Sequence, residues 1–233
     1  MKNINYKSRC LFLLASLLTL FSSCSGFTEI DLPSSQLTSS LVFQDKSTAN
    51  AAMVDIYSKI RDKGVLTGYS SGFSMQLGLY ADELFFLGSA SASQSNFYNN
   101  TLLQSDAALS ELWNSSYSQI YAANAVTEGL ATSSGISVAD KQQLLGEALF
   151  VRALIHFYLL NVFGDIPYIT ATDHKKNSIA VRMPKKIVYE QIKKDLELSC
   201  NLLPKAYNGV ERVRPNKFAA KALLARLCLY MEN

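Results

Sequence analysis

Histidine and cysteine, which supply many metal ligands and nucleophiles, are scarce in this sequence. Two histidines and four cysteines occur among 233 residues, and no two cysteines stand in a Cys-x-x-Cys spacing. The sequence therefore predicts no metal site and no cofactor. His156 falls in an apolar stretch, where we expect a buried, hydrogen-bonded ring, and His174 falls in a polar segment beside two lysines. No grouping of Ser, His and Asp typical of nucleophilic catalysis is indicated, and we expect a protein that is not an enzyme.

Charge is scarce and nearly balanced. Charged residues make up 18% of the chain and apolar residues 48%, which excludes a disordered polyelectrolyte and predicts a substantial core. Lys2, Lys7 and Arg9 account for the net charge of +3, since residues 1–23 contain no acid. The rest is neutral without a basic run, so we expect no nucleic-acid partner. We predict the following acids on solvated helix exteriors: Asp55, Asp62, Asp195 and Glu197.

The first 23 residues have the organisation of a signal peptide. A positive start precedes the apolar run Leu11–Phe21, which is too short to span a bilayer. The segment 21–24, Phe-Ser-Ser-Cys, resembles a bacterial lipobox, in which the cysteine is acylated and becomes the first residue of the mature chain. Cys24 is therefore the predicted lipid anchor, and two or three acyl chains would hold it stably in a membrane. A buried N-terminal helix, or an ordinary signal with an incidental cysteine, is the alternative.

Apolar residues recur at three- and four-residue spacing along most of the remaining chain, which predicts amphipathic helices. The expected helices are 45–62, 74–86, 106–130, 137–163, 184–203 and one that follows Pro215. Ser47 is predicted to cap the first helix, and Ser137 with Asp140 forms a capping-box sequence. No segment alternates as a strand would, so the sequence predicts an all-α fold.

The chain is predicted to have three parts: a signal peptide (1–23), a lipid-anchored tether (24–44) and a helical domain (45–233). Paired helices with apolar inner faces must stack to bury them, so we expect a tetratricopeptide-like helical-repeat bundle with long loop insertions. The last helix is still apolar where the sequence stops, and we expect a fragment that is truncated at its C-terminus.

Two cysteines remain in the predicted domain, Cys200 and Cys228. Both lie on apolar helix stripes, so we predict small buried side chains, with a disulfide left open. Trp113, the only tryptophan, is expected in the core, with a ligand-binding role as the alternative. Glu147 and Arg152 lie five residues apart on different helix faces, and each is expected to bond a neighbouring helix or turn.

Four segments, in this order along the chain, resemble the SusD/RagB family of outer-membrane nutrient-binding lipoproteins. They are residues 112–124, 146–167, 188–204 and 214–230. The first is similar to the family's Trp…Tyr…Ile…Ala-Asn helix. The second is similar to its Glu-Ala…Arg-Ala helix and its Phe-Gly-x-x-Pro turn. The resemblance covers nearly all of the predicted mature chain, but only the N-terminal half of the family.

The resemblance implies a surface lipoprotein of the outer membrane that captures glycans and closes over a SusC-type TonB-dependent transporter. Its tetratricopeptide-like helices would form the scaffold and much of the transporter contact. The ligand site would come from loops and from the C-terminal half of the family.

The loop 82–104 offers aromatic faces and planar polar groups, the side chains that bind sugar rings and hydroxyls. The candidate ligand-binding residues are Asp82, Phe97, Tyr98, Asn99 and Asn100. We expect Phe97 or Tyr98 to stack on a sugar ring and Asn99 or Asp82 to bind hydroxyls. The alternative is that Phe85 and Phe86 pack inward and that 96–100 forms a capping turn.

Three other functions fit the same residues. The cargo could be a peptide or glycopeptide, or the protein could be a helical scaffold with protein partners only. A glycan-degrading enzyme is the third, because paired carboxylates meet only in space.

Overall fold

Every regular element of the described residues is a helix. The computed structural model describes residues 39–89 and 93–231, so the predicted signal peptide and Cys24 lie outside the described residues. The helices are α2 (Ser39–Val42), α3 (Lys46–Asp62), α4 (Phe73–Tyr80), α5 (Ser93–Tyr98), α6 (Ala107–Thr132), α7 (Val138–Phe163), α8 (His174–Asn177), α9 (Lys185–Leu202) and α10 (Lys217–Met231). Within these ranges the only β contact is one antiparallel bridge between Ile166 and Met183. The predicted all-α fold is confirmed for this part of the chain.

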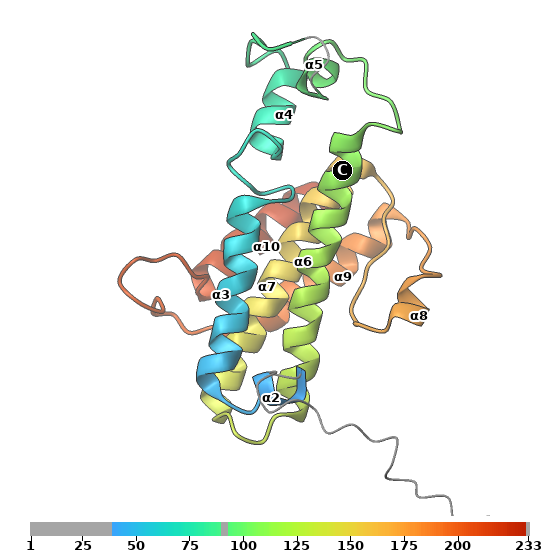
Figure 1. Cartoon of the computed structure of the whole chain (residues 1–233). Coiled ribbons are helices and arrows are strands. Elements are labelled where there is room, and N and C mark those ends of the chain that lie inside the picture. Colours follow the sequence, from blue (N-terminus) through green and yellow to red (C-terminus); the bar gives the residue numbers. More distant parts are fainter. Residues whose placement is uncertain (1–38, 90–92, 232–233) are drawn as a thin grey trace, which may run out of the picture. The chain divides into compact units, whose positions relative to one another are not determined.

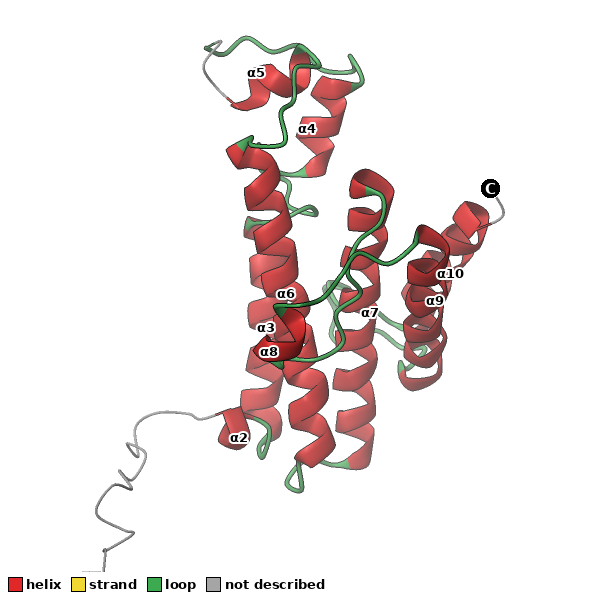
Figure 2. Ribbon diagram, turned by 90° about the vertical axis from the view of Figure 1, so that its right-hand side faces the viewer, coloured by secondary structure: helices red, strands yellow, loops and turns green. Residues whose placement is uncertain are grey.

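Helix α7 lies at the centre of the fold, as its apolar sequence predicts. It packs between α3 and α6 on one side and α9 and α10 on the other (Figures 1 and 2). Among the described helices, it alone has the length and composition to cross a membrane, but 67% of its most apolar stretch is buried by its neighbours. A helix that is covered on all sides needs apolar side chains all round, so its composition is that of a core helix.

The two helix pairs predicted from the sequence are formed by α6 with α7 and by α9 with α10, and α7 against α9 joins them. On α3 the buried residues are Ala49, Met53 and Ile56, which recur every three or four positions. This spacing brings them to the one face that meets α6 and α7. Apolar faces that are not stable alone in water are thus buried by stacking.

Helix caps follow local rules, with one correction. Ser137 caps α7 as expected, since its Oγ accepts from the backbone N–H of Asp140 at 3.2 Å, which is the N-cap half of a capping box, and it also donates to the Asp140 carboxylate at 2.7 Å. The prediction that Ser47 caps α3 is wrong. Asp45 is the N-cap, and its carboxylate accepts from the backbone N–H groups of Ser47 and Thr48 at 2.8 and 3.2 Å. A carboxylate there satisfies two free amides and also carries the charge that a helix N-terminus favours.

The folded helices begin before residue 45, the predicted start of the domain. Helix α2 packs on α3 and α6, and Phe43 is buried. A Cβ built on Gly129 of α6 would lie 2.0 Å from the Phe43 ring, so only glycine allows this contact. The last residues of the predicted tether therefore belong to the helical fold.

The insertion between α3 and α6 contains two short helices. The helix expected over 74–86 is α4, which ends earlier, at Tyr80. Asp82, two residues later, has φ +58°, a left-handed conformation that no α-helix continues through. The expected loop 82–104 includes α5, which packs against α4.

The two cysteines of the domain have different environments. Cys200 is buried, as predicted, whereas Cys228 is exposed, and both are free thiols. The prediction for Cys228 is wrong because α9 covers only one side of α10, the side that carries Ala220, Leu223 and Leu227.

Candidate functional site

The candidate ligand-binding residues gather where α4 and α5 meet. Asp82 lies in the turn after α4, Phe97 and Tyr98 form the end of α5, and Asn99 and Asn100 follow directly. Asp82 and Asn100 both have positive φ angles, +58° and +55°, and both side chains are exposed. Asp and Asn tolerate this conformation better than most residues, so these two positions shape the turns that present the site.

The aromatic residues of this region differ in burial: Phe97 is buried, Phe86 and Tyr98 are half-buried, and Phe85 is exposed. Phe97 is only 3% exposed, whereas Phe85 is 76% exposed. The Tyr98 ring meets the Phe85 ring nearly edge-on at 5.4 Å and lies 6.5 Å from the Phe86 ring. Of the two rings predicted to stack on a sugar, Tyr98 is therefore the one near the surface, and Phe85 extends its apolar face instead of packing inward.

The polar residues hold α5 against the start of α6. The Asn96 amide donates to Asp106 Oδ1 at 2.9 Å, and the backbone N–H of Leu103 donates to Asp106 Oδ2 at 2.7 Å. The exposed Asn99 side chain donates to Ser95 Oγ at 3.0 Å, one turn back in α5. These bonds to Asp106 and Ser95 fix the backbone of α5 and of the segment that follows it.

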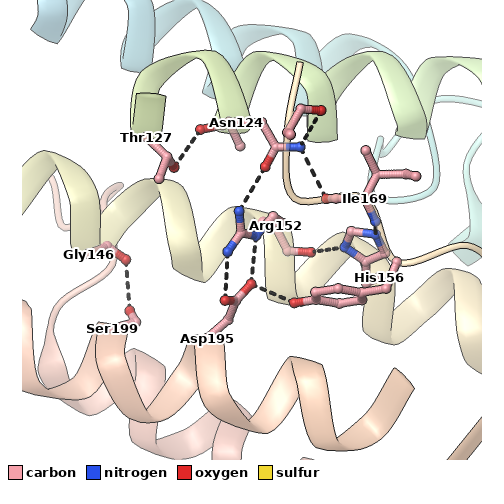
Figure 3. Close-up of polar contacts among 11 residues, drawn as sticks. Asn124, Thr127, Gly146, Arg152, His156, Ile169, Asp195 and Ser199 are labelled. Atoms are coloured by element: carbon pink, nitrogen blue, oxygen red, sulfur yellow. Dashed lines mark hydrogen bonds and ion pairs between the residues drawn. The ribbon is translucent and has the colours of Figure 1, made fainter. Parts of the chain in front are cut away.

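A second cluster of polar residues is buried between α6, α7 and α9 (Figure 3). Arg152 forms a two-pronged ion pair with Asp195, with Nε 2.6 Å from Oδ2 and Nη2 2.7 Å from Oδ1. Its Nη1 donates to Asn124 Oδ1 at 2.8 Å. The predicted partner of Arg152 on a neighbouring helix is confirmed. The prediction of Asp195 on a solvated exterior is wrong, because this residue lies on the buried stripe of α9 and is 8% exposed.

The same cluster fixes the segment that follows α7. Tyr168 donates to Asp195 Oδ2 at 2.5 Å, and Asn124 donates to the Ile169 carbonyl at 3.1 Å. Burial, then the Asp195 charge, raises the pKa of Tyr168, so its hydroxyl stays a donor. Each of these side chains has its hydrogen-bond partners within the fold. The cluster therefore holds the segment after α7 in place.

His156 is buried and hydrogen-bonded on both sides, as predicted. Its Nδ1 lies 2.8 Å from the Arg152 carbonyl, and the backbone N–H of Ile169 donates to its Nε2 at 3.3 Å. A carbonyl only accepts and an N–H only donates, so Nδ1 carries the proton and Nε2 the lone pair. Burial lowers the pKa of His156 to about 3, and the ring is neutral. His174 is exposed on α8, which replaces the expected polar loop.

Glu147 ties α7 to α3 and to the segment before α10. It accepts from the Tyr57 hydroxyl at 2.8 Å and from Arg214 Nε at 2.7 Å. Burial, then the Glu147 charge, raises the pKa of Tyr57. As predicted, Glu147 does not pair with Arg152 and bonds neighbouring elements of the fold.

Two features of the described residues bear on metal binding and on nucleophilic catalysis. No three His, Cys, Asp or Glu side chains gather there as metal ligands would. Residues 68–72 have a Gly-x-Ser-x-Gly spacing, but they form a turn between α3 and α4, whereas the nucleophile elbow with this spacing lies between a strand and a helix.

Comparison with known proteins gives one consistent family. A SusD-like family model, described as starch-binding and associating with outer membrane, matches residues 38–229. SusD-like protein P25 of Formosa agariphila is 24% identical over 227 residues, which covers 91% of this chain and 41% of the relative. A SusD-like protein of Bacteroides ovatus is 31% identical over 130 residues, which covers 53% of this chain and 23% of the relative. The chain spans less than half the length of these relatives.

Solved structures share the fold. A SusD superfamily protein from Bacteroides vulgatus superposes with a TM-score of 0.70 at 22% identity, over 82% of this chain and 41% of that one. A laminarin-binding SusD-like protein superposes with a TM-score of 0.68 at 24% identity, over 80% of this chain and 40% of that one. The all-α arrangement of the described residues is therefore that of SusD-like proteins.

Proposed function

Because the chain belongs to the SusD-like family, we propose that it is a non-catalytic binding lipoprotein of the outer membrane. In this proposal it captures glycans at the cell surface and delivers them to a SusC-type TonB-dependent transporter. The family model, described as starch-binding and associating with outer membrane, and the laminarin-binding structural neighbour both support glycan as the cargo.

The observation that carries the proposal is the contact between the exposed Phe85 ring and the half-buried Tyr98 ring, in the same insertion as Asp82. Flat apolar faces favour the C–H faces of sugar rings, and carboxylate and amide groups pair with hydroxyls. Asp82, Asn99 and Asn100 supply such groups at the exposed turns on either side of the rings. We assign the hydroxyl contacts to these three residues and the stacking to Tyr98, with buried Phe97 supporting α5 from beneath.

The test is glycan binding by the whole chain, purified in detergent. Phe85→Ala and Tyr98→Ala should each raise the Kd for laminarin or starch about tenfold, since a stacked ring contributes roughly 1.5 kcal/mol. Tyr207→Ala is the matched control, because Tyr207 is 46% exposed and lies in the connection between α9 and α10. Equal Kd values for all four proteins would contradict the assignment. Tight binding of peptides and none of glycans would favour peptide cargo, and release of new reducing ends would indicate an enzyme.

The membrane part of the proposal depends on Cys24. Without its thiol no acyl chain is added, so Cys24→Ser protein should leave the outer-membrane fraction and become soluble. Fractionation and metabolic labelling with a fatty acid measure this. Cys228→Ser is the control, because Cys228 is an exposed thiol of the folded domain. Unchanged labelling of the Cys24→Ser protein would disprove the anchor.

A further inference from the structure

A surface groove follows α6 between that helix and the segment 165–183, which connects α7 to α9. Three adjoining hollows form it, with volumes of about 270, 310 and 440 Å³. The first and second share Tyr121 as a lining residue, and the second and third share Trp113. The three hollows therefore follow one another along the helix, and the far end of this row, which we call the groove, is lined by Gln104, four residues after Asn100.

The floor of the groove is aromatic at a regular spacing. Trp113, Tyr117 and Tyr121 lie four residues apart, which places them about 6 Å apart along the helix axis on one slowly turning face. This step is close to the length of one hexose unit in a polysaccharide. The Trp113 and Tyr117 rings lie 4.8 Å apart, and Trp113 is half-buried, packed against the core and edge-on to Phe163. Tyr121 is 52% exposed and offers the open ring.

The opposite wall is held rigidly by hydrogen bonds to α6. The Tyr117 hydroxyl donates to the Pro167 carbonyl at 2.7 Å, and the backbone N–H of Thr172 donates to Glu128 at 2.9 Å. Asn177 closes the segment on itself through a bond to the Ala171 carbonyl at 2.8 Å. A groove that is already formed loses little conformational entropy when a ligand enters it.

The charges of the groove indicate a neutral ligand. Its lining contains one cation, Arg182, and one anion, Glu128. The Arg182 guanidinium lies 5.2 Å from the centre of the Trp113 ring and donates to the Asp165 carbonyl at 2.6 Å. Exposed Gln104 and Asn114 add planar amides at the same end. Aromatic rings with planar polar groups and no net charge match the faces and hydroxyls of a neutral sugar polymer.

We propose that this groove is a second glycan-binding surface, which takes a run of a neutral hexose polymer with Tyr121 as its exposed stacking ring. The proposal rests on the glycan-binding function and adds a site separate from the turns around Asp82 and Tyr98. Two linked sites on one polymer raise the overall affinity, because binding at one raises the effective concentration at the other. Long polymers should then depend on both sites and short oligosaccharides on one.

The experiment compares Tyr121→Ala and Tyr121→Phe with the wild-type chain and with the Tyr207→Ala control. Laminarin and starch are the polymer probes, and their trisaccharides are the short probes. Tyr121→Ala should raise the Kd for the bound polymer about tenfold, because one stacked ring is lost. Tyr121→Phe should bind as the wild type does, because the ring is kept. A bound polymer should also slow hydrogen exchange in residues 167–182.

The outcomes separate this proposal from the function on which it depends. If Tyr121→Ala binds polymer as the control does while Tyr98→Ala is weakened, the groove proposal is overturned and glycan binding stands. If the wild-type chain binds none of the glycans, both are overturned. Unchanged exchange in 167–182 with bound polymer would also overturn the groove, even if the Tyr121→Ala protein failed to fold.

Discussion

At the scale of single residues, burial changes what a titratable side chain can do. His156 is enclosed by Arg152, Tyr168 and Ile169, and its ring stacks 4.1 Å from the Tyr168 ring. Its neutral form donates through Nδ1 and accepts through Nε2, so a second proton would remove the acceptor for Ile169. The ring therefore contributes to stability only while it is neutral.

Stability should consequently fall in mild acid. Burial lowers the pKa of His156 from 6.5 to about 3, so the unfolded chain binds the proton more tightly than the folded protein. The contribution is complete above pH 6.5 and is lost as the pH falls towards 3. Between pH 7 and pH 5 it amounts to about 2 kcal/mol. Urea unfolding at both pH values measures it. His156→Gln keeps a donor and an acceptor without titrating, and this variant should lose about 2 kcal/mol less than the wild type. Identical pH dependence would contradict the assignment.

At the scale of elements, Asp106 links the insertion to the core. It is the residue before α6, yet its carboxylate does not cap that helix and instead bonds Asn96 and Leu103. The carboxylate therefore fixes α5 and the segment after it, which carry Tyr98 and Asn99.

Asp106→Ala should loosen this segment without unfolding α6. Loss of the two bonds should raise the hydrogen-exchange rates of residues 93–106 and leave those of 113–132 unchanged. Glycan affinity should fall because the loosened segment must be ordered again on binding. Ser137→Ala is the comparison variant. It removes the cap of α7, which costs about 1 kcal/mol, and should leave exchange in 93–106 as it is. Slow exchange in that segment of the Asp106→Ala protein would disprove the link.

At the scale of the whole molecule, Arg152 links α7 to both α6 and α9, and no sequence motif indicates this link. Its guanidinium joins α6 through Asn124 and α9 through Asp195, and both partners also hold the segment after α7. That segment is one wall of the groove, so the buried ion pair positions a surface that it does not touch.

Arg152→Met should be strongly destabilising, by about 3–5 kcal/mol, because it leaves Asp195 buried without a cation. The double variant Arg152→Met/Asp195→Leu should recover much of that loss, since no unpaired charge remains. Arg61→Met serves as control, because the Arg61–Asp62 pair is exposed and should leave the urea midpoint unchanged. If the double variant were no more stable than the single one, the unpaired charge would not be the cause.

The sequence by itself determined the long helices, α3, α6, α7, α9 and α10, but not the short helices α2, α5 and α8. The apolar spacing of 137–163 and the capping box at Ser137 involve only residues near each other in the chain, so they are readable without the fold. The different faces occupied by Glu147 and Arg152 follow from helix geometry in the same way. The family's motifs lie in these helices, and for this reason the sequence also indicated the family.

Only the tertiary structure decided which faces are covered and which groups meet. Asp195 is buried because α7 places Arg152 opposite it, and Cys228 is exposed because α9 covers the other side of α10. Phe97 and Tyr98 are adjacent and chemically alike, yet only packing against neighbours turned one ring inward. The groove beside Tyr121 is formed by segments about fifty residues apart. Helix formation depends on local periodicity, whereas burial depends on what a distant segment places on each face, and local sequence patterns do not reveal that.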